Sequence, residues 1–447
     1  MKLKQLGKKF NNIHFLSLLT NGSVAALGVI SNALLCRALS LNDRGEWLVF
    51  LTTFLTVDSL RSGFLTTAFI KFYAGAEKEK ADRVAGSSWF IALVITLGIC
   101  IINIPTWFIA GHIKDTGLSL FFKWVGINML VSLPYFMAIC LLQAQARFDK
   151  LLRLRLFNII CFIAFILILY FANLSTTQYT IYAYMLSFAI SSMVALLTGW
   201  SQVQTFSKKS REHILELYHF GKFSVGTIVS ANMFWTIETY IVRYFLGPAA
   251  LAVLDIGVKL LEIIEIPLRS FAASGMPLLS AAYNNNDPQQ VLTTMKKMIG
   301  MLTVIMVPVI LVTIVFAEIP ISLLGGGKYV HTEAVNLFRI FLVLCLLFPA
   351  DRYMALTLDA IHKPRVNFYK ALVMLAVIVI ADIIGIQLTG NIYGIAYASP
   401  FPIIIAILIS YYHIQKYTPF RFWDIYRFGY QETWKNLEVI KKRFTKS

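Results

Sequence analysis

Long apolar segments follow one another through almost the whole chain, with short polar connections between them. We count about twelve segments of roughly 20 residues, the length an α-helix needs to cross the hydrocarbon core of a bilayer. The chain is therefore predicted to be an all-α polytopic membrane protein of about twelve transmembrane helices. The predicted spans are 15–38, 47–70, 87–110, 122–145, 156–174, 179–200, 223–245, 249–273, 298–318, 335–359, 367–388 and 392–413.

The distribution of charge agrees with this prediction. Charged residues make up 14% of the 447 residues, whereas a soluble domain has about 25%. The net charge of +17 comes from Lys and Arg gathered in every second connection, a positive-inside pattern that places both termini in the cytoplasm. This pattern argues against a nucleic-acid partner. The basic connections are the N-terminus, 71–86, 146–155, 201–222, 280–297, 361–370 (Lys363, Arg365, Lys370) and the tail from Lys416.

Signatures of enzymes and metal sites are missing from the sequence. There is no Gly-rich phosphate loop, GxSxG or HExxH, and Gly325-Gly326-Gly327-Lys328 lacks the Walker spacing. The five cysteines lie singly in or beside apolar segments, which predicts neither a disulfide nor a metal. We therefore expect no enzymatic activity, catalytic residue, cofactor or metal. The N-terminal apolar run is expected to remain as the first span, because it lacks a convincing signal-peptide cleavage site.

A weak internal repeat appears at an offset of 207 residues, where Ser23 meets Ser230, Leu39 meets Leu246 and Asp58 meets Glu265. Six spans per half would give two parallel six-helix bundles around a central cavity. A shift of 215 also aligns Pro134 with Pro349. The predicted division is an N-terminal bundle (1–207), a cytoplasmic amphipathic linker (208–222), a C-terminal bundle (223–413) and a basic interfacial tail (414–447).

The segment 251–273 is long enough to span a bilayer yet carries five charges. Each charge at the centre of a lipid-facing helix costs roughly 2.5–3.5 kcal/mol on insertion scales, so five on the lipid face would be prohibitive. At 100° per residue they share roughly 120° of the helix circumference, and their spacing permits i,i+3 and i,i+4 pairs. We expect a charged stripe that faces water. Its members are Asp255, Lys259, Glu262, Glu265 and Arg269.

Charges also interrupt other spans, and intramembrane ionisable residues mark substrate or ion routes by default. Asp58 and Arg61 are either cavity-lining residues or a structural ion pair. Glu238 is expected to face the cavity or the next span, whereas Arg243 is close enough to the outer end to snorkel. The pair Asp351-Arg352 follows Pro349, where a broken helix would expose carbonyl groups to water.

Two further polar features have alternatives that the sequence leaves open. Asp382 is a lone acid in an apolar span, and it is either a proton site or a partner in an interhelical hydrogen bond. Asn21 and Asn32 lie on one face of the first span, where interhelical hydrogen bonding explains them adequately.

The segment NGSVAALGVISNALLCRALSLNDRGEWLVF resembles the first-span signature of Wzx-type polysaccharide-biosynthesis flippases, within the multidrug/oligosaccharidyl-lipid/polysaccharide exporter superfamily. The later segment VRYFLGPAALAVLDI is similar to the second-half recurrence in that family. Ser40 and the Arg44-Gly45-Glu46 turn depart from the usual pattern and leave the substrate open. The matching positions are Arg37, Leu39, Asn42, Asp43, Gly45 and Trp47, then Leu246, Gly247, Pro248 and Ala252.

This resemblance implies transfer of an undecaprenyl-diphosphate-linked oligosaccharide from the inner to the outer leaflet, with a polysaccharide polymerase and a chain-length regulator as further partners. A diphosphate needs cations to replace its hydration inside a membrane. Two alternatives stay open: an ion-coupled multidrug exporter with an acid-lined cavity, and a non-transporting scaffold for glycan assembly. The expected cavity cations are Arg61, Lys259, Arg269 and Arg352. The expected cavity acids or ion-coupling residues are Asp58, Glu238, Asp255, Glu262, Glu265 and Asp351.

Overall fold

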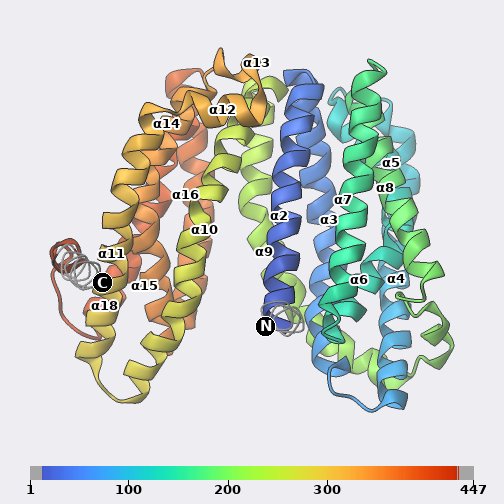
Figure 1. The fold of residues 1–447 in the computed structure, drawn as a ribbon, viewed down its shortest axis with the longest axis horizontal. Coiled ribbons are helices and arrows are strands. Elements are labelled where there is room, and N and C mark those ends of the chain that lie inside the picture. The colour runs from blue at the N-terminus through green and yellow to red at the C-terminus, as the bar shows by residue number, and fades with distance from the viewer. Residues whose placement is uncertain (1–12, 430, 432–447) are drawn as a thin grey trace, which may run out of the picture. The chain divides into compact units, whose positions relative to one another are not determined.

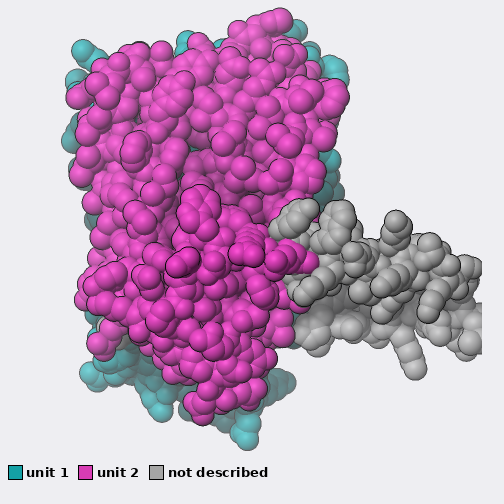
Figure 2. Space-filling view, turned by 90° about the vertical axis from the view of Figure 1, so that its left-hand side faces the viewer, with its two compact units in different colours: residues 1–252 teal, residues 253–447 magenta. Residues whose placement is uncertain are grey.

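The computed structural model describes residues 13–429 and 431, with the side chains of 13–19, 21, 223, 227, 231, 267, 269, 270 and 272–274 left out. The described residues form helices and turns without a β-strand (Figure 1). They divide into two compact units, Met1–Ala252 and Val253–Ser447 (Figure 2). We call these unit 1 and unit 2.

Unit 1 is organised around α3, which packs against α4, α5 and α9. Its aromatic core includes Trp47, whose ring lies 5.7 Å from Phe50 and 5.4 Å from Tyr184. Such pairs add about 0.5–1.5 kcal/mol each beyond the burial of their surface. The helices of unit 1 are α2 (Ile13–Ala38), α3 (Leu41–Tyr73), α4 (Lys78–Ala110), α5 (Thr116–Val131), α6 (Leu133–Ala144), α7 (Phe148–Phe171), α8 (Thr177–Leu197), η1 (Val203–Lys208) and α9 (Arg211–Leu246).

Unit 2 contains most of α10 (Pro248–Asn284), which begins at the end of unit 1. An apolar core of unit 2 joins α10, α11, α15 and α18 around Met295, Tyr353 and Met354, each at most 1% exposed. The remaining helices are α11 (Pro288–Val315), α12 (Glu318–Gly325), α13 (Gly327–Val330), α14 (Ala334–Leu344), η2 (Cys345–Leu347), α15 (Phe348–Ala360), α16 (Pro364–Thr389), α17 (Tyr393–Ala398) and α18 (Pro400–Gln415).

The predicted all-α membrane fold is confirmed, because every predicted span falls on a helix or on consecutive helices. Among the described residues, eight helical segments are long and apolar enough to cross a membrane, and a bent pair makes a ninth. The helices α2, α9 and α10 have 26, 36 and 37 residues and lie outside that set. They would bring the count to the predicted twelve, which stays a prediction.

The two prolines that the repeat aligns both begin a new helix. Pro134 lies in the first turn of α6, and α5 and α6 meet at a bend of 49°. Pro349 lies in the first turn of α15, directly after the 3₁₀ turn η2. Because proline has no backbone N–H and clashes with the preceding turn, a helix interrupted before it is the expected geometry. The interruption before Pro349 is the 3₁₀ turn η2 within the apolar segment Ala334–Ala360, and exposure of its carbonyl groups to water stays a prediction.

The segment predicted as a linker, 208–222, is mostly the start of a long helix. Ser210 caps α9 by accepting a hydrogen bond from the His213 N–H at 3.3 Å, and the helix then continues to Leu246. Leu217 in this first part is fully buried against the α3, α4 and α6 core. Consequently α9, which the sequence assigned to the second bundle, belongs to unit 1.

The described part of the tail packs on α11. Gly300 and Gly429 cross so closely that a Cβ at Gly300 would lie 2.3 Å from the Gly429 Cα. Ile425 is fully buried, and the Lys296 ammonium lies 3.7 Å from the Asp424 carboxylate. Burial also raises the pKa of the Tyr426 phenol. The tail is thus anchored by protein contacts, where the sequence predicted an interfacial segment; residues 432–447 lie outside the described part.

Candidate functional site

The charged stripe of α10 changes its environment along the helix. Asp255 is fully buried near the start of unit 2, where Ile256 packs against Gly325. One turn later, Lys259 donates a 2.8 Å hydrogen bond to Glu262, and the side chains are 37% and 48% exposed. The predicted Lys259–Glu262 pair is confirmed. It stands on a helix whose other positions are mostly apolar.

Two other members of the stripe are less fully defined. Glu265 is half-buried on α10, and the Arg269 side chain lies outside the described residues. The predicted pairing of Asp255 with Lys259 therefore stays a prediction, as does that of Glu265 with Arg269. What the structure establishes is an accessible ion pair in the middle of a long helix.

Asp58 and Arg61 form an ion pair of 2.6 Å inside unit 1. The Arg61 guanidinium is only 2% exposed and lies 4.7 Å from the centre of the Phe136 ring. It also donates to the Met129 carbonyl at 2.9 Å and to the Ser132 hydroxyl at 3.1 Å. Both acceptors lie at the α5–α6 break. In this structure Arg61 therefore ties α3 to the broken helix, which favours the structural alternative over direct contact with a substrate.

Asp351 pairs with a residue that the sequence assigned to a loop. The Lys370 ammonium lies 3.0 Å from Asp351 and donates to the Ser410 hydroxyl at 3.4 Å. Lys370 is 7% exposed in α16, so the structure places it in the predicted span 367–388 and not in the basic connection 361–370 that overlaps it. Lys370 lies near the start of α16, and hydropathy alone does not show that its side chain points toward Asp351 and not toward water. Arg352, the neighbouring predicted cation, is exposed.

The predicted acid Glu238 is half-buried on α9, and Arg243 lies near the end of the same helix. The Arg243 guanidinium forms a 2.6 Å ion pair with Asp115, and both side chains are about four-fifths buried. Asp115 also caps α5 by accepting from the Leu118 N–H at 2.8 Å. The pair therefore links the ends of α9 and α5.

The two segments that carry the family resemblance touch each other. A Cβ at Gly45 would lie 1.9 Å from the Pro248 carbonyl oxygen, so only glycine permits this approach. The Gly247 backbone has φ of +88°, a conformation that also favours glycine. This contact between the start of α3 and the α9–α10 turn was not predicted. Similarity between two segments does not say that they meet.

The same two helices, α3 and α9, share a hydrogen-bonded seam. The hydroxyls of Thr53 and Tyr240 lie 2.6 Å apart, and those of Thr56 and Thr236 lie 2.7 Å apart. Further along, Gly221 packs on the Phe64 backbone carbonyl, where a Cβ would lie 2.6 Å away. Small and hydroxyl-bearing residues allow helices to approach closely in a membrane. The sequence contains this signal in α3 and α9, but it does not identify them as partners.

The remaining polar predictions have mixed outcomes. Asn32 accepts a hydrogen bond from Arg44, which confirms the interhelical role expected for Asn32. The Asn21 side chain lies outside the described residues. Asp382 is 4% exposed, and its Oδ2 atom has no hydrogen-bond partner in the described part of the chain. Both alternatives for Asp382 stay open.

The sequence profile of polysaccharide biosynthesis proteins matches residues 34–334, which include the α3–α9 seam and the charged stripe. The chain belongs to this family. No curated protein matches it by sequence. The family match and the apolar helical segments of the described residues together make the protein a multi-pass membrane protein of the polysaccharide biosynthesis family.

Solved structures of similar fold come from the MOP superfamily. An inward-facing multidrug resistance MATE family transporter has a TM-score of 0.70 at 16% identity, with 89% of this chain and 96% of that chain covered. The lipid II flippase MurJ in an inward closed conformation has a TM-score of 0.65 at 15% identity, with 95% and 92% covered. A MOP superfamily transporter from Pyrococcus furiosus, described as having a binding pocket of reversed polarity, has a TM-score of 0.56 at 15% identity. The match covers 89% of this chain and 94% of that chain. At these identities the likeness establishes the fold.

Proposed function

We propose that the protein translocates an undecaprenyl-diphosphate-linked oligosaccharide repeat unit, a precursor of O-antigen, capsule or exopolysaccharide, from the inner to the outer leaflet of a bacterial cytoplasmic membrane. Both termini lie in the cytoplasm, and transport proceeds by alternating access. The family match supports a role in polysaccharide assembly. The fold shared with a lipid II flippase supports a lipid-linked substrate.

The observation that carries the proposal is the accessible Lys259–Glu262 pair on α10. A diphosphate loses its hydration when it enters a membrane-embedded site, and a cation must compensate for that loss. Lys259 can exchange its Glu262 partner for a phosphate oxygen without first being extracted from the protein core. Glu262 then balances the charge of the site when no substrate is bound. Arg61, which is buried and engaged at the α5–α6 break, holds the helices of unit 1 together.

A second candidate, a multidrug exporter, has a specific observation in its favour: the 0.70 TM-score to a multidrug resistance transporter. Cationic drugs require acids that are not already matched by bases. Three of the predicted cavity acids, Glu262, Asp58 and Asp351, each have a basic partner within 3.0 Å. We therefore favour the anionic lipid-linked substrate.

The test is a substitution that removes the cation and leaves the fold intact. An exposed pair contributes about 0–1 kcal/mol to stability, so Lys259→Met should insert and fold normally. The substitution should lower delivery of lipid-linked repeat units to the outer leaflet about tenfold or more. This factor corresponds to the free energy of one lost hydrogen bond to a charged group. Lys78→Met, at an exposed position at the start of α4, is the matched control. Delivery by Lys259→Met at the level of the control would refute this role.

A further inference from the structure

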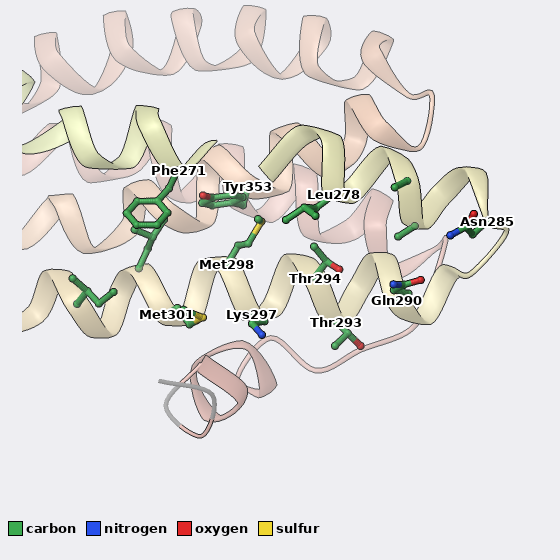
Figure 3. A pocket seen from close by; sticks show the side chains of 14 residues that line it. Phe271, Leu278, Asn285, Gln290, Thr293, Thr294, Lys297, Met298, Met301 and Tyr353 are labelled. Carbon is green, nitrogen blue, oxygen red and sulfur yellow. The ribbon is translucent and has the colours of Figure 1, made fainter. Parts of the chain in front are cut away.

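A cavity of about 450 Å³ opens between α10 and α11 in unit 2, outside the charged stripe. This volume lies within the range of roughly 300–1,000 Å³ that is typical of small-molecule sites. Figure 3 shows Phe271, Leu278 and Tyr353 on one side of the cavity, with Met298 and Thr294 of α11 opposite. All of the lining residues belong to unit 2.

The lining of the cavity is polar at one end of α10 and α11 and apolar at the other. At the α10–α11 turn it is made by Asn285, Gln290, Thr293 and Thr294, with Lys297 as its cation. These side chains offer amide, hydroxyl and ammonium donors. Their number and type suit the several acceptor oxygens of a phosphate group.

Further from the turn the lining becomes apolar. It contains Leu278, Met301 and Phe271, and it ends near Ile305. Leu278, Phe271 and Ile305 are 55%, 50% and 46% exposed, so this end opens sideways and is not closed off by the core. Fourteen residues separate Asn285 from Phe271, which corresponds to about 21 Å at 1.5 Å per residue. A polar end followed by an open apolar channel of this length matches a lipid lying along the membrane normal.

Charges around the polar end determine which lipid fits. Asp287 caps α11 by accepting from the Gln290 N–H at 2.9 Å, so its carboxylate is engaged at the helix start. Lys296, the neighbour of Lys297, faces Asp424 of the tail and does not line the cavity. The lining itself contains one cation and no acid. The proposed orientation places this turn at the cytoplasmic surface, where the membrane leaflet is rich in anionic lipid.

We propose that the α10–α11 groove is a binding site for an anionic glycerophospholipid. Its phosphate is held by Lys297 and the neighbouring hydroxyl and amide groups, and one acyl chain lies along Leu278, Met301 and Phe271. The site is separate from the Lys259–Glu262 pair. It also does not depend on which substrate the protein transports.

The experiment is native mass spectrometry of the purified full-length protein titrated with phosphatidylglycerol, with zwitterionic phosphatidylcholine, which has no net charge, as the comparison. Lys297→Gln removes the cation, and Leu278→Trp fills the apolar channel. Their matched controls are Lys78→Gln, at an exposed cation of unit 1, and Leu311→Trp, at a 59% exposed position of α11 outside the groove. Size-exclusion profiles and thermal stability confirm that each variant is folded.

We expect Lys297→Gln to weaken phosphatidylglycerol binding about tenfold or more and Leu278→Trp to remove the tight binding event, whereas both controls bind like the parent protein. Three results would each overturn the proposal: both groove variants binding like the parent, phosphatidylcholine binding as tightly as phosphatidylglycerol, or a polyprenyl phosphate displacing phosphatidylglycerol at lower concentration. The last result would assign the groove to a polyprenyl lipid.

Discussion

Replacing Arg61 by methionine separates a structural arginine from one that contacts substrate. The side chain is 2% exposed and bonds to Asp58 at 2.6 Å, to the Met129 carbonyl at 2.9 Å and to Ser132 at 3.1 Å. Methionine retains much of the side-chain volume but removes the charge and all of these donors. Breaking a buried ion pair by removing one partner costs about 3–5 kcal/mol. Because Asp58 is 23% exposed and can be partly hydrated, we expect a loss near the lower end of that range.

The assay is chemical unfolding of the detergent-solubilised protein, with Arg83→Met as the matched control. Arg83 pairs with Glu79 at 2.5 Å, but these side chains are 49% and 79% exposed, so the control should lose at most about 1 kcal/mol. The double variant Asp58→Asn/Arg61→Met should regain part of the lost stability, because no buried carboxylate is left uncompensated. Equal stability losses for Arg61→Met and Arg83→Met would refute the assignment of Arg61 as a structural anchor.

Further predictions concern close helix contacts and a buried cation. Gly45→Ala places a Cβ 1.9 Å from a backbone oxygen of the α9–α10 turn and should destabilise by about 1–3 kcal/mol in thermal unfolding, whereas Gly98→Ala, with no atom within 4 Å, should not. Gly300→Ala should loosen the tail and speed tryptic cleavage within 416–429; an unchanged cleavage rate would contradict the tail contact. Lys370→Met should cost about 1–3 kcal/mol, and neutralising its carboxylate partner as well should restore part of this; a full additive loss would argue against the pair.

The sequence predicts the transmembrane helices well because length and hydropathy are local properties. Each apolar segment must satisfy its own backbone hydrogen bonds in lipid, so its secondary structure does not depend on its neighbours. The Lys259–Glu262 pair was also predictable, since residues three apart on one helix are neighbours wherever the helix lies. The break at Pro349 follows from the missing N–H of proline.

Contacts between helices were harder to predict. The Gly45–Pro248 contact and the Thr53–Tyr240 hydrogen bond join residues about 200 and 190 positions apart, and no local pattern connects them. The depth of Lys370 was misjudged because its charge matched the basic connections, while its partner Asp351 lies on another helix. For the same reason, α9 was separated from the helices on which it packs. Pairings between helices depend on tertiary packing, and a single sequence contains only weak signals for that packing.

The central claim is that this protein moves a lipid-linked glycan across the membrane. The most direct measurement is the leaflet distribution of lipid-linked repeat units after deletion of the gene, with complementation by the parent protein and by Lys259→Met. The account predicts that complete repeat units accumulate on the cytoplasmic side and that only the parent protein restores their delivery outward. Unchanged glycan export accompanied by new sensitivity to cationic dyes would contradict it and would identify the protein as a drug exporter.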